Sequence, residues 1–473
     1  MNVRVLVLSA TVVVAACLAS MLVVVAARGG DDGPSAGPAP APAPAAQFPP
    51  SRLATASGEP LEEDWGASAA QCGECHTVQY EDWRGSIHNR AHEDGLYHAF
   101  ALLARKEDPA LYVFCSACHA PAAVASGEIP GGKGREETFH TEEGVTCVVC
   151  HAAKSMREVH AGGGANASLV LEAGDVMFGP LADPAKTTFH GSEHSPLHTK
   201  AEFCSNCHSL LHPTNGLVIE DTFKEWREGP YAAAGVQCQD CHMRTVAQSV
   251  EVAEKMKPLL VPGRTTKSPE ERPNVYSHTF VGGSVNAAVN GTRDFHAAEA
   301  ERRLQSAATV ALKLPERAAP GATASVEVAV TNRSAGHAIP TSITELRQVW
   351  IDLRATDASG REVFRSGAID DAGRVDPKAV MYHSVLADAA GVVTYLPWRA
   401  VKMVSEKLIP PKATVRERYD VAIPKDAKGP LAFTATLRYR SAPQEVLDAL
   451  FGKGKLPIRA VDMASAQGAL AVE

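Results

Sequence analysis

The pattern of apolar and polar residues divides the chain into three stretches with different periodicities. The first stretch, residues 5–27, is an almost unbroken apolar run that is long enough to cross a bilayer as a helix. The middle stretch, up to about residue 304, shows only short and broken helical periodicity and is rich in Gly and His. From about Ala307 onward, apolar residues recur at every second position, which predicts β-strands.

The period-two stretch predicts an antiparallel β-sandwich of short strands separated by turn signals. We expect Trp350, Asp352 and Arg354 to lie on the opposite face from their apolar neighbours. A short helix is expected over residues 442–452. The apolar positions of the predicted strands are Val326, Val328, Val330, Val349, Ile351, Leu353, Val415, Tyr419, Val421, Leu431, Phe433, Ala435, Leu437 and Tyr439.

The N-terminal apolar run follows a short positive start that contains Arg4, which is typical of an export signal. Its length favours an uncleaved membrane anchor over residues 1–28, with a cleaved signal peptide or a lipid anchor at Cys17 as alternatives. Residues 29–60 are rich in Pro and Ala and predict a semi-rigid linker. In all three cases the rest of the chain is expected on the periplasmic side, and in the first it is anchored to the inner membrane.

A pentapeptide of the form C-x-x-C-H occurs five times in the middle stretch, and it is the attachment signature of c-type haem. Its two thiols can form thioethers to the two vinyl groups of a porphyrin, and the adjacent histidine then takes the proximal position on the iron. The sequence therefore predicts five covalently bound haems c. The attachment cysteines are Cys72, Cys75, Cys115, Cys118, Cys147, Cys150, Cys204, Cys207, Cys238 and Cys241, and the proximal histidines are His76, His119, His151, His208 and His242.

Other interpretations of the cysteine pairs are weaker. A structural zinc site needs four ligands from two converging pairs, whereas each pair here is followed directly by a histidine. A thioredoxin-like redox pair would require a βαβ context, which the pattern does not show. Ten of the eleven cysteines belong to the five motifs and the remaining one is Cys17, so no pair is left for a structural disulfide.

Length and charge limit the classes of function. A chain of 473 residues is expected to form two or three domains. The formal net charge is −8, which argues against a nucleic-acid partner and for redox-protein partners, a donor and an acceptor, guided by charge. The membrane is the further partner that we expect, through the N-terminal segment.

Over about residues 71–283 the chain resembles the multihaem cytochrome c family typified by cytochrome c554. The resemblance implies closely stacked haems, mostly with two histidine ligands, that pass electrons from one to the next. Cytochrome c554 itself has fewer haems and no β-domain, so its substrate does not carry over. The residues that carry the resemblance are Cys72 to His76 with Tyr80, Trp83 and His88, Glu143 to His151, Ser195 to His198, Cys204 to His208, and Thr222 to Met243. Residues 336–341 resemble a motif in the β-domain of relatives that have such an appendage.

Thirteen histidines outside the motifs are available as sixth ligands of the irons. We favour His88, His198 and His278 from their motif contexts, and we also consider His140 and His337. His337 is expected on a loop between two strands, from which it would reach a haem. The remaining histidines are His92, His98, His160, His190, His194, His212, His296 and His383.

Together these patterns predict an α+β chain, in which a loop-rich, mainly helical five-haem domain (residues 61–304) is followed by an antiparallel β-sandwich domain (residues 305–445). Residues 446–473 are expected to form a C-terminal helix and tail. The expected function is electron transfer along five haems on the extracytoplasmic side of a membrane. The alternatives are an oxidoreductase that acts on a nitrogen or sulfur oxyanion at one open haem, and a redox-sensing protein that binds a partner.

Overall fold

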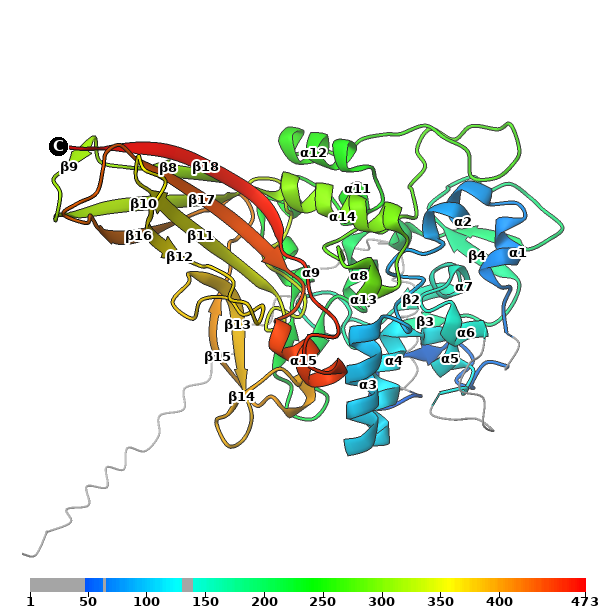
Figure 1. Ribbon diagram of the computed structural model, residues 1–473. Helices are drawn as coiled ribbons and strands as arrows, with labels where there is room; N and C mark the ends of the chain where they lie inside the picture. Colours follow the sequence, from blue (N-terminus) through cyan, green and yellow to red (C-terminus); the bar gives the residue numbers. More distant parts are fainter. Residues whose placement is uncertain (1–46, 63–64, 130–138) are drawn as a thin grey trace, which may run out of the picture. The chain divides into compact units, whose positions relative to one another are not determined.

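The computed structural model describes residues 47–62, 65–129 and 139–473. Residues 43–473 form one compact unit. The predicted anchor and most of the predicted linker lie outside the described residues. Figure 1 shows short helices and loops in the first half of the described chain and long strands in the second half, which confirms the predicted α+β class.

The helices of the first half are short, because the chain turns repeatedly around the cavity described below. Only α3, α4, α12 and α14 among the described helices of this half reach ten residues. The bounds of the helices are α1 Ala69–Gly73, α2 Thr77–Trp83, α3 Gly95–Glu107, α4 Pro109–His119, α5 Pro121–Ala125, α6 Phe139–Glu142, α7 Cys147–His151, α8 Ala201–Ser205, α9 Thr222–Arg227, α10 Pro230–Ala233, α11 Gln239–His242, α12 Val246–Lys255, α13 Ala287–Asn290 and α14 Asp294–Ala307. Short strands lie between them: β1 Ala54–Thr55, β2 Ala153–Met156, β3 Leu169–Leu171, β4 Val176–Gly179, β5 Gly191–His194, β6 Leu210–Leu211 and β7 Val218–Glu220.

The second half contains two sheets that share one hydrophobic core. The smaller sheet has the order β16-β10-β8, and the larger one runs β14-β13-β11-β17-β18-β9 with β12 and β15 attached at its side. All pairs are antiparallel except β9 with β18. The strands are β8 Ala308–Lys313, β9 Arg317–Ala318, β10 Thr323–Asn332, β11 Gln348–Thr356, β12 Glu362–Ser366, β13 Met381–Ala387, β14 Val393–Thr394, β15 Lys402–Lys407, β16 Thr414–Ala422, β17 Leu431–Arg440 and β18 Val461–Val472, with helix α15 Gln444–Phe451 between the last two.

Strand β17 follows the predicted alternation, since its five apolar positions from Leu431 to Tyr439 are all buried. Strand β11 alternates as well, but the face that carries Trp350 and Asp352 is also covered. Trp350 is fully buried and donates its indole N–H to the carbonyl of Gly367, and Asp352 pairs with Arg365 and Arg438. Trp350 and Asp352 lie opposite Val349 and Ile351, as expected, and this second face is covered as well.

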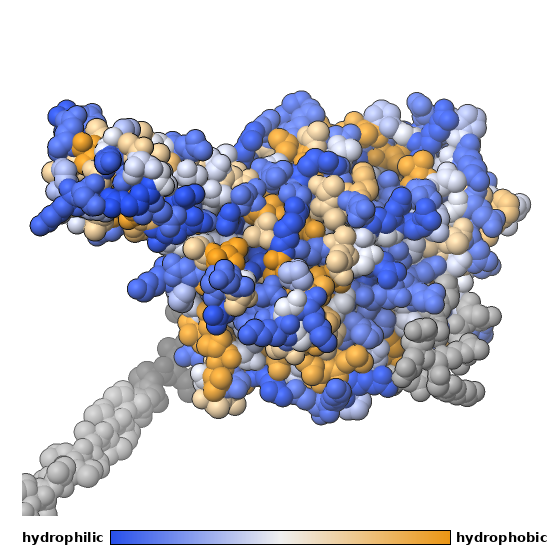
Figure 2. Space-filling view, viewed as in Figure 1, coloured by the Kyte–Doolittle hydropathy of each residue, from blue (hydrophilic) through white to orange (hydrophobic). Residues whose placement is uncertain are grey.

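The C-terminal segment also differs from the prediction. The expected helix is present as α15, but the expected tail contains β18, which pairs with β17 along almost its full length. The predicted boundaries at residues 304/305 and 445/446 fall inside α14 and α15. Figure 2 shows a largely hydrophilic surface with an apolar patch over β14 and β15, where Val392, Val393, Val401 and Val404 are exposed.

Candidate haem-binding site

All fifteen cysteines and histidines of the five motifs line one cavity of about 1950 Å³. Each motif forms a single helical turn. Its histidine follows the first cysteine by four residues and therefore lies next to that cysteine on the same side of the turn. The backbone N–H of His76 donates to the carbonyl of Cys72, and His208 and His242 bond in the same way to Cys204 and Cys238. This turn brings both thiols and the imidazole of a motif to the same side of the backbone.

Four of the five motif imidazoles are held in the same way. Nδ1 of His76, His119, His151 and His242 lies 2.5–2.8 Å from a backbone carbonyl, belonging to Thr265, Ala91, Phe178 and Val281 respectively. A carbonyl can only accept, so Nδ1 carries the proton and Nε2 keeps its lone pair. This is the tautomer that a metal-ligating histidine needs, and the donor set therefore fits haem iron.

Burial supports the same state. It lowers the pKa of His151, His119 and His242, and that of His242 falls to about 3. A neutral imidazole is the form that binds iron, since a protonated ring has no lone pair to offer.

The fifth imidazole, His208, has a different partner. Its Nδ1 lies 3.5 Å from Oε1 of Glu220, whose side chain is 7% exposed. Burial by itself would lower the pKa of His208, but the hydrogen bond and charge of Glu220 raise it to about 9.

Histidines from distant parts of the chain face four of these imidazoles. Two axial metal–nitrogen bonds of about 2 Å place the centres of two ligand rings about 6 Å apart across an iron. The ring centres are 6.3 Å apart for His76 and His190, 6.4 Å for His88 and His208, and 6.1 Å for His242 and His337. His151 has two neighbours, with His278 at 6.4 Å and His198 at 5.7 Å.

Of the expected sixth ligands, His88, His198, His278 and His337 all line the cavity. His278 and His337 donate Nδ1–H to the carbonyls of Tyr276 and Ala338, which leaves Nε2 available. His198 instead has Nε2 within 2.9 Å of the carbonyl of Cys150.

His140 is different, because both of its ring nitrogens are engaged. Nδ1 lies 2.6 Å from Glu128 and Nε2 lies 3.0 Å from the carbonyl of Trp65. No nitrogen of this ring is left for an iron, and we do not propose His140 as a ligand.

His190 was not among the histidines favoured from the sequence. Its Nδ1 lies 2.8 Å from the carbonyl of Gly191, and its ring faces His76. His190 lies between the paired strands β4 and β5, directly before Gly191, the first residue of β5. No sequence motif around His190 distinguishes it from the other histidines.

His119 has no such facing imidazole. Within the described residues its ring contact is with Tyr97, which stacks on it at 3.7 Å between ring centres and 7° between planes. Tyr97 therefore lies along the face of the imidazole and orients it.

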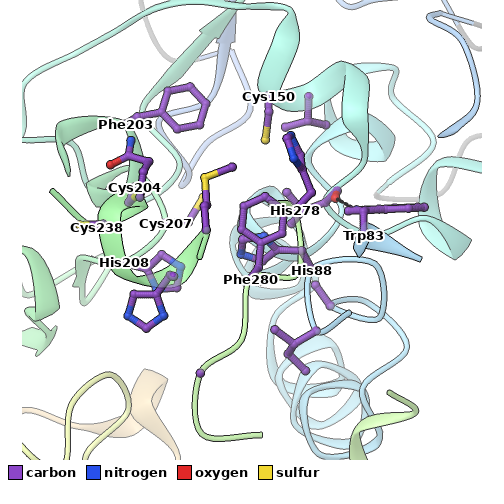
Figure 3. Close-up of a pocket in the computed structure, with 18 of the residues that line it drawn as sticks. Trp83, His88, Cys150, Phe203, Cys204, Cys207, His208, Cys238, His278 and Phe280 are labelled. Carbon is purple, nitrogen blue, oxygen red and sulfur yellow. Dashed lines mark hydrogen bonds between the residues drawn. The ribbon is translucent and has the colours of Figure 1, made fainter. Parts of the chain in front are cut away.

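Thiols of different motifs lie close to one another. The pKa is lowered for Cys72 by the neighbouring Cys147, for Cys207 by Cys118, and for Cys204 by Cys238. Figure 3 shows Cys204, Cys207 and Cys238 grouped beside His208, with Cys150, His88 and His278 across the cavity. The fourth motif therefore lies next to the second and the fifth.

The loop between β10 and β11 brings His337 to the cavity. Glu225, on α9, accepts hydrogen bonds from the backbone N–H of Ala338 and from the hydroxyl of Thr341. Thr222 on the same helix bonds to Thr341 at 2.8 Å. These contacts fasten the β-sheet region to the helical region directly after His337 in the chain.

Comparison with known proteins gives a family and a fold. The family model described as cytochrome c554 and c-prime matches residues 71–152. No curated protein matches the chain in sequence. The fold is similar to the crystal structure of a penta-heme cytochrome c552 from Thermochromatium tepidum, with a TM-score of 0.60 and 20% identity over 85% of this chain and 99% of that chain. The CARDB domain of a Pyrococcus furiosus protein, solved with di-metal ions, aligns at a TM-score of 0.18 and 11% identity over 35% of this chain and 87% of that chain, which is too low to support a conclusion. Residues 71–152 thus resemble the family of cytochrome c554 and c-prime, and the chain has a fold similar to that of a penta-heme cytochrome, with a C-terminal β-domain.

Proposed function

We propose that this protein transfers electrons along five covalently bound haems. The observation that carries the proposal is that all five C-x-x-C-H motifs line one cavity, in which four of the five imidazoles offer Nε2 in the iron-binding tautomer. Haems held in one cavity lie close enough together for electrons to pass between them. Haem supplies the one-electron chemistry, and the residues of this chain hold it, orient it and exclude water.

In this proposal each pair of motif cysteines forms the two thioethers and the following histidine is the proximal ligand. The sixth ligands that fit the ring spacing are His190 for His76, His88 for His208, His278 for His151, and His337 for His242. His198 is the alternative for His151. Two histidine ligands fill both axial positions, and such an iron exchanges electrons without binding a substrate.

The thiol contacts support a branched route. The haem of the first motif neighbours that of the third through Cys72 and Cys147. The haem of the fourth motif neighbours those of the second and fifth, and the thiols of Cys204 and Cys207 also act on the pKa of Cys150 in the third. We therefore propose that the haem at Cys204 and Cys207 is the junction of the route.

The five-haem proposal predicts the mass of the mature protein. Mass spectrometry of the denatured full chain should show the addition of five haems, because thioether bonds survive unfolding. Cys241→Ala should loosen or remove one haem and leave four. Any other number in the unsubstituted protein would contradict the proposal.

We also propose that the protein acts outside the cytoplasm, where c-type haem is attached, and that residues 1–28 anchor it to the inner membrane. Within residues 47–62, 65–129 and 139–473, no helix is long and apolar enough to cross a bilayer. The proposal therefore rests on the apolar run of residues 5–27 alone. Its partners are a redox-protein donor and acceptor. Release of the haem protein from membranes by salt washing alone would contradict the anchor.

A second function, reduction or oxidation of a small molecule at one open haem, is favoured by the surroundings of His119. Its ring contact in the described chain is Tyr97 and not a second imidazole. We expect carbon monoxide to shift the Soret band of one of the five reduced haems in the unsubstituted protein. A spectrum that does not respond to carbon monoxide would leave electron transfer as the only role and contradict this second function.

A further inference from the structure

The surroundings of His208 differ in charge from those of the other four proximal histidines. Glu220 ends strand β7 and directs Oε1 at Nδ1 of His208 from 3.5 Å. The hydroxyl of Thr222 lies 3.4 Å from the same oxygen. The other proximal imidazoles meet neutral carbonyl groups. Among the described residues, His208 is therefore the proximal imidazole whose Nδ1 has a carboxylate partner. Asp94 and Glu220 also raise the pKa of His119, but Nδ1 of that ring is bonded to the carbonyl of Ala91.

The charge of Glu220 is poorly screened. Its side chain is 7% exposed, whereas that of its ion-pair partner among the described residues, His208, is 50% exposed because it lines the cavity. Electrostatic interactions between buried groups are several times stronger than between groups in water. A second acid, Glu345, is buried nearby, and neither of its carboxylate oxygens has a hydrogen-bond partner in the described chain.

A carboxylate that accepts the Nδ1 proton of a metal-bound histidine makes the ring a stronger electron donor. Stronger donation and a nearby negative charge both stabilise ferric iron relative to ferrous iron, because the ferric ion carries the greater positive charge. A carbonyl dipole has the same effect in a much weaker form.

We infer that Glu220 makes the haem attached at Cys204 and Cys207 the hardest of the five to reduce. This inference rests on the proposed function. Because that haem is the proposed junction, electrons would reside on the haems of the other four motifs and occupy the junction haem only briefly. Glu220 is in this sense a positioning residue, since it acts on the iron through His208.

The test is an anaerobic redox titration of the full-length holoprotein with dithionite, followed by paramagnetic resonance. Dithionite supplies one electron to each ferric iron, which becomes ferrous. In the unsubstituted protein, one low-spin signal should persist to the lowest potential. In Glu220→Gln, the equilibrium constant for reduction of this haem should increase at least tenfold, so the midpoint potential of its signal should rise by about 59 mV or more for one electron. The g-values of this signal should also change.

Two variants separate this effect from general ones. Asp221→Asn removes the neighbouring carboxylate, which pairs with His160 and Lys224 and does not contact His208. It should leave the g-values of the signal unchanged and shift its midpoint by less than Glu220→Gln does. Glu220→Asp keeps the charge but withdraws it by one methylene group, so its shift should be upward and smaller than that of Glu220→Gln.

Haem content is measured by mass before each titration. Fewer than five haems in the unsubstituted protein would contradict the proposed function itself. With five haems present, unchanged midpoints in Glu220→Gln, or equal shifts in Glu220→Gln and Asp221→Asn, would overturn the inference about Glu220 alone. If Glu220→Gln does not load haem, an unchanged midpoint in Glu220→Asp would overturn it.

Discussion

Replacing His337 with alanine should convert one of the five haems from low spin to high spin and open it to carbon monoxide. The ring centre of His337 lies 6.1 Å from that of His242, and the two planes differ by 16°. Nδ1–H of His337 donates to the carbonyl of Ala338, so Nε2 is the nitrogen available to an iron. Alanine offers no donor atom, and the haem at Cys238 and Cys241 would lose its sixth ligand.

Paramagnetic resonance and the Soret band with carbon monoxide measure this change. His383→Ala is the matched control, because His383 also belongs to the β-sheet region but does not line the cavity. It should give the spectrum of the unsubstituted protein. A His337→Ala protein with the spin states of the unsubstituted protein would show that His337 is not a ligand.

If His337 binds iron, the β-domain has a structural role in the haem region. The bond between iron and His337 would join the loop between β10 and β11 to the fifth motif. Glu225 already holds both Ala338 and Thr341 at this loop, and the two contacts limit how far His337 can move. A loop fixed in this way can keep an imidazole in one position, as a sixth ligand requires.

Much of the fold could be predicted because each element leaves a local trace in the sequence. The alternation of β17 was visible because its outer face carries polar or small residues, including Thr434 and Arg438. Strand β18 was missed because Ala, Ser and Gly dominate its middle, so large apolar residues do not alternate with polar ones there.

The alternation of β11 could be predicted, but the burial of both its faces could not, because sequence periodicity does not show what covers the second face. Its second face is covered by groups that are remote in sequence. The guanidinium of Arg440 lies over the Trp350 ring at 5.8 Å, and Arg365 and Arg438 neutralise Asp352. Polar residues such as Asp352 can be buried when charged partners reach them, and no local pattern announces those partners.

The attachment motifs could be read from the sequence because a haem needs its two thiols and proximal histidine within five residues. A sixth ligand has no such constraint, since it comes from any segment that the fold brings to the opposite side. His190 faces His76 across a long separation in sequence, and its neighbours give no sign of this. His140 was considered as a ligand, but Glu128 and the Trp65 carbonyl occupy both of its nitrogens, which only the fold could reveal.

Replacing Glu345 with glutamine should stabilise the protein at pH 8 and make its stability less dependent on pH. Glu345 is 2% exposed and neither carboxylate oxygen has a hydrogen-bond partner in the described chain. Burial raises the pKa of Glu345 to about 8, with a further contribution from Glu220, while its own backbone N–H and Arg347 act in the opposite direction. The folded protein therefore keeps this proton over a pH range in which the unfolded chain has lost it.

The sign of the effect follows from that difference. Between the ordinary glutamate pKa of 4.5 and about 8, the folded state binds one more proton than the unfolded state. The free energy of unfolding then falls by about 1.4 kcal/mol for each pH unit, and the accumulated loss at pH 8 is on the order of 4 kcal/mol. Glutamine cannot ionise, so Glu345→Gln should avoid most of this loss and differ little from the unsubstituted protein near pH 5.

Guanidinium denaturation followed by circular dichroism at pH 5 and pH 8 measures the difference. Glu316→Gln is the matched control, because Glu316 is exposed and its substitution should leave the gap between the two pH values unchanged. A Glu345→Gln protein whose midpoint falls between pH 5 and pH 8 as much as that of the unsubstituted protein would show that Glu345 is already ionised in the folded state. In that case the backbone N–H of Glu345 and the charge of Arg347, which both lower the pKa of this carboxyl, outweigh the effect of burial.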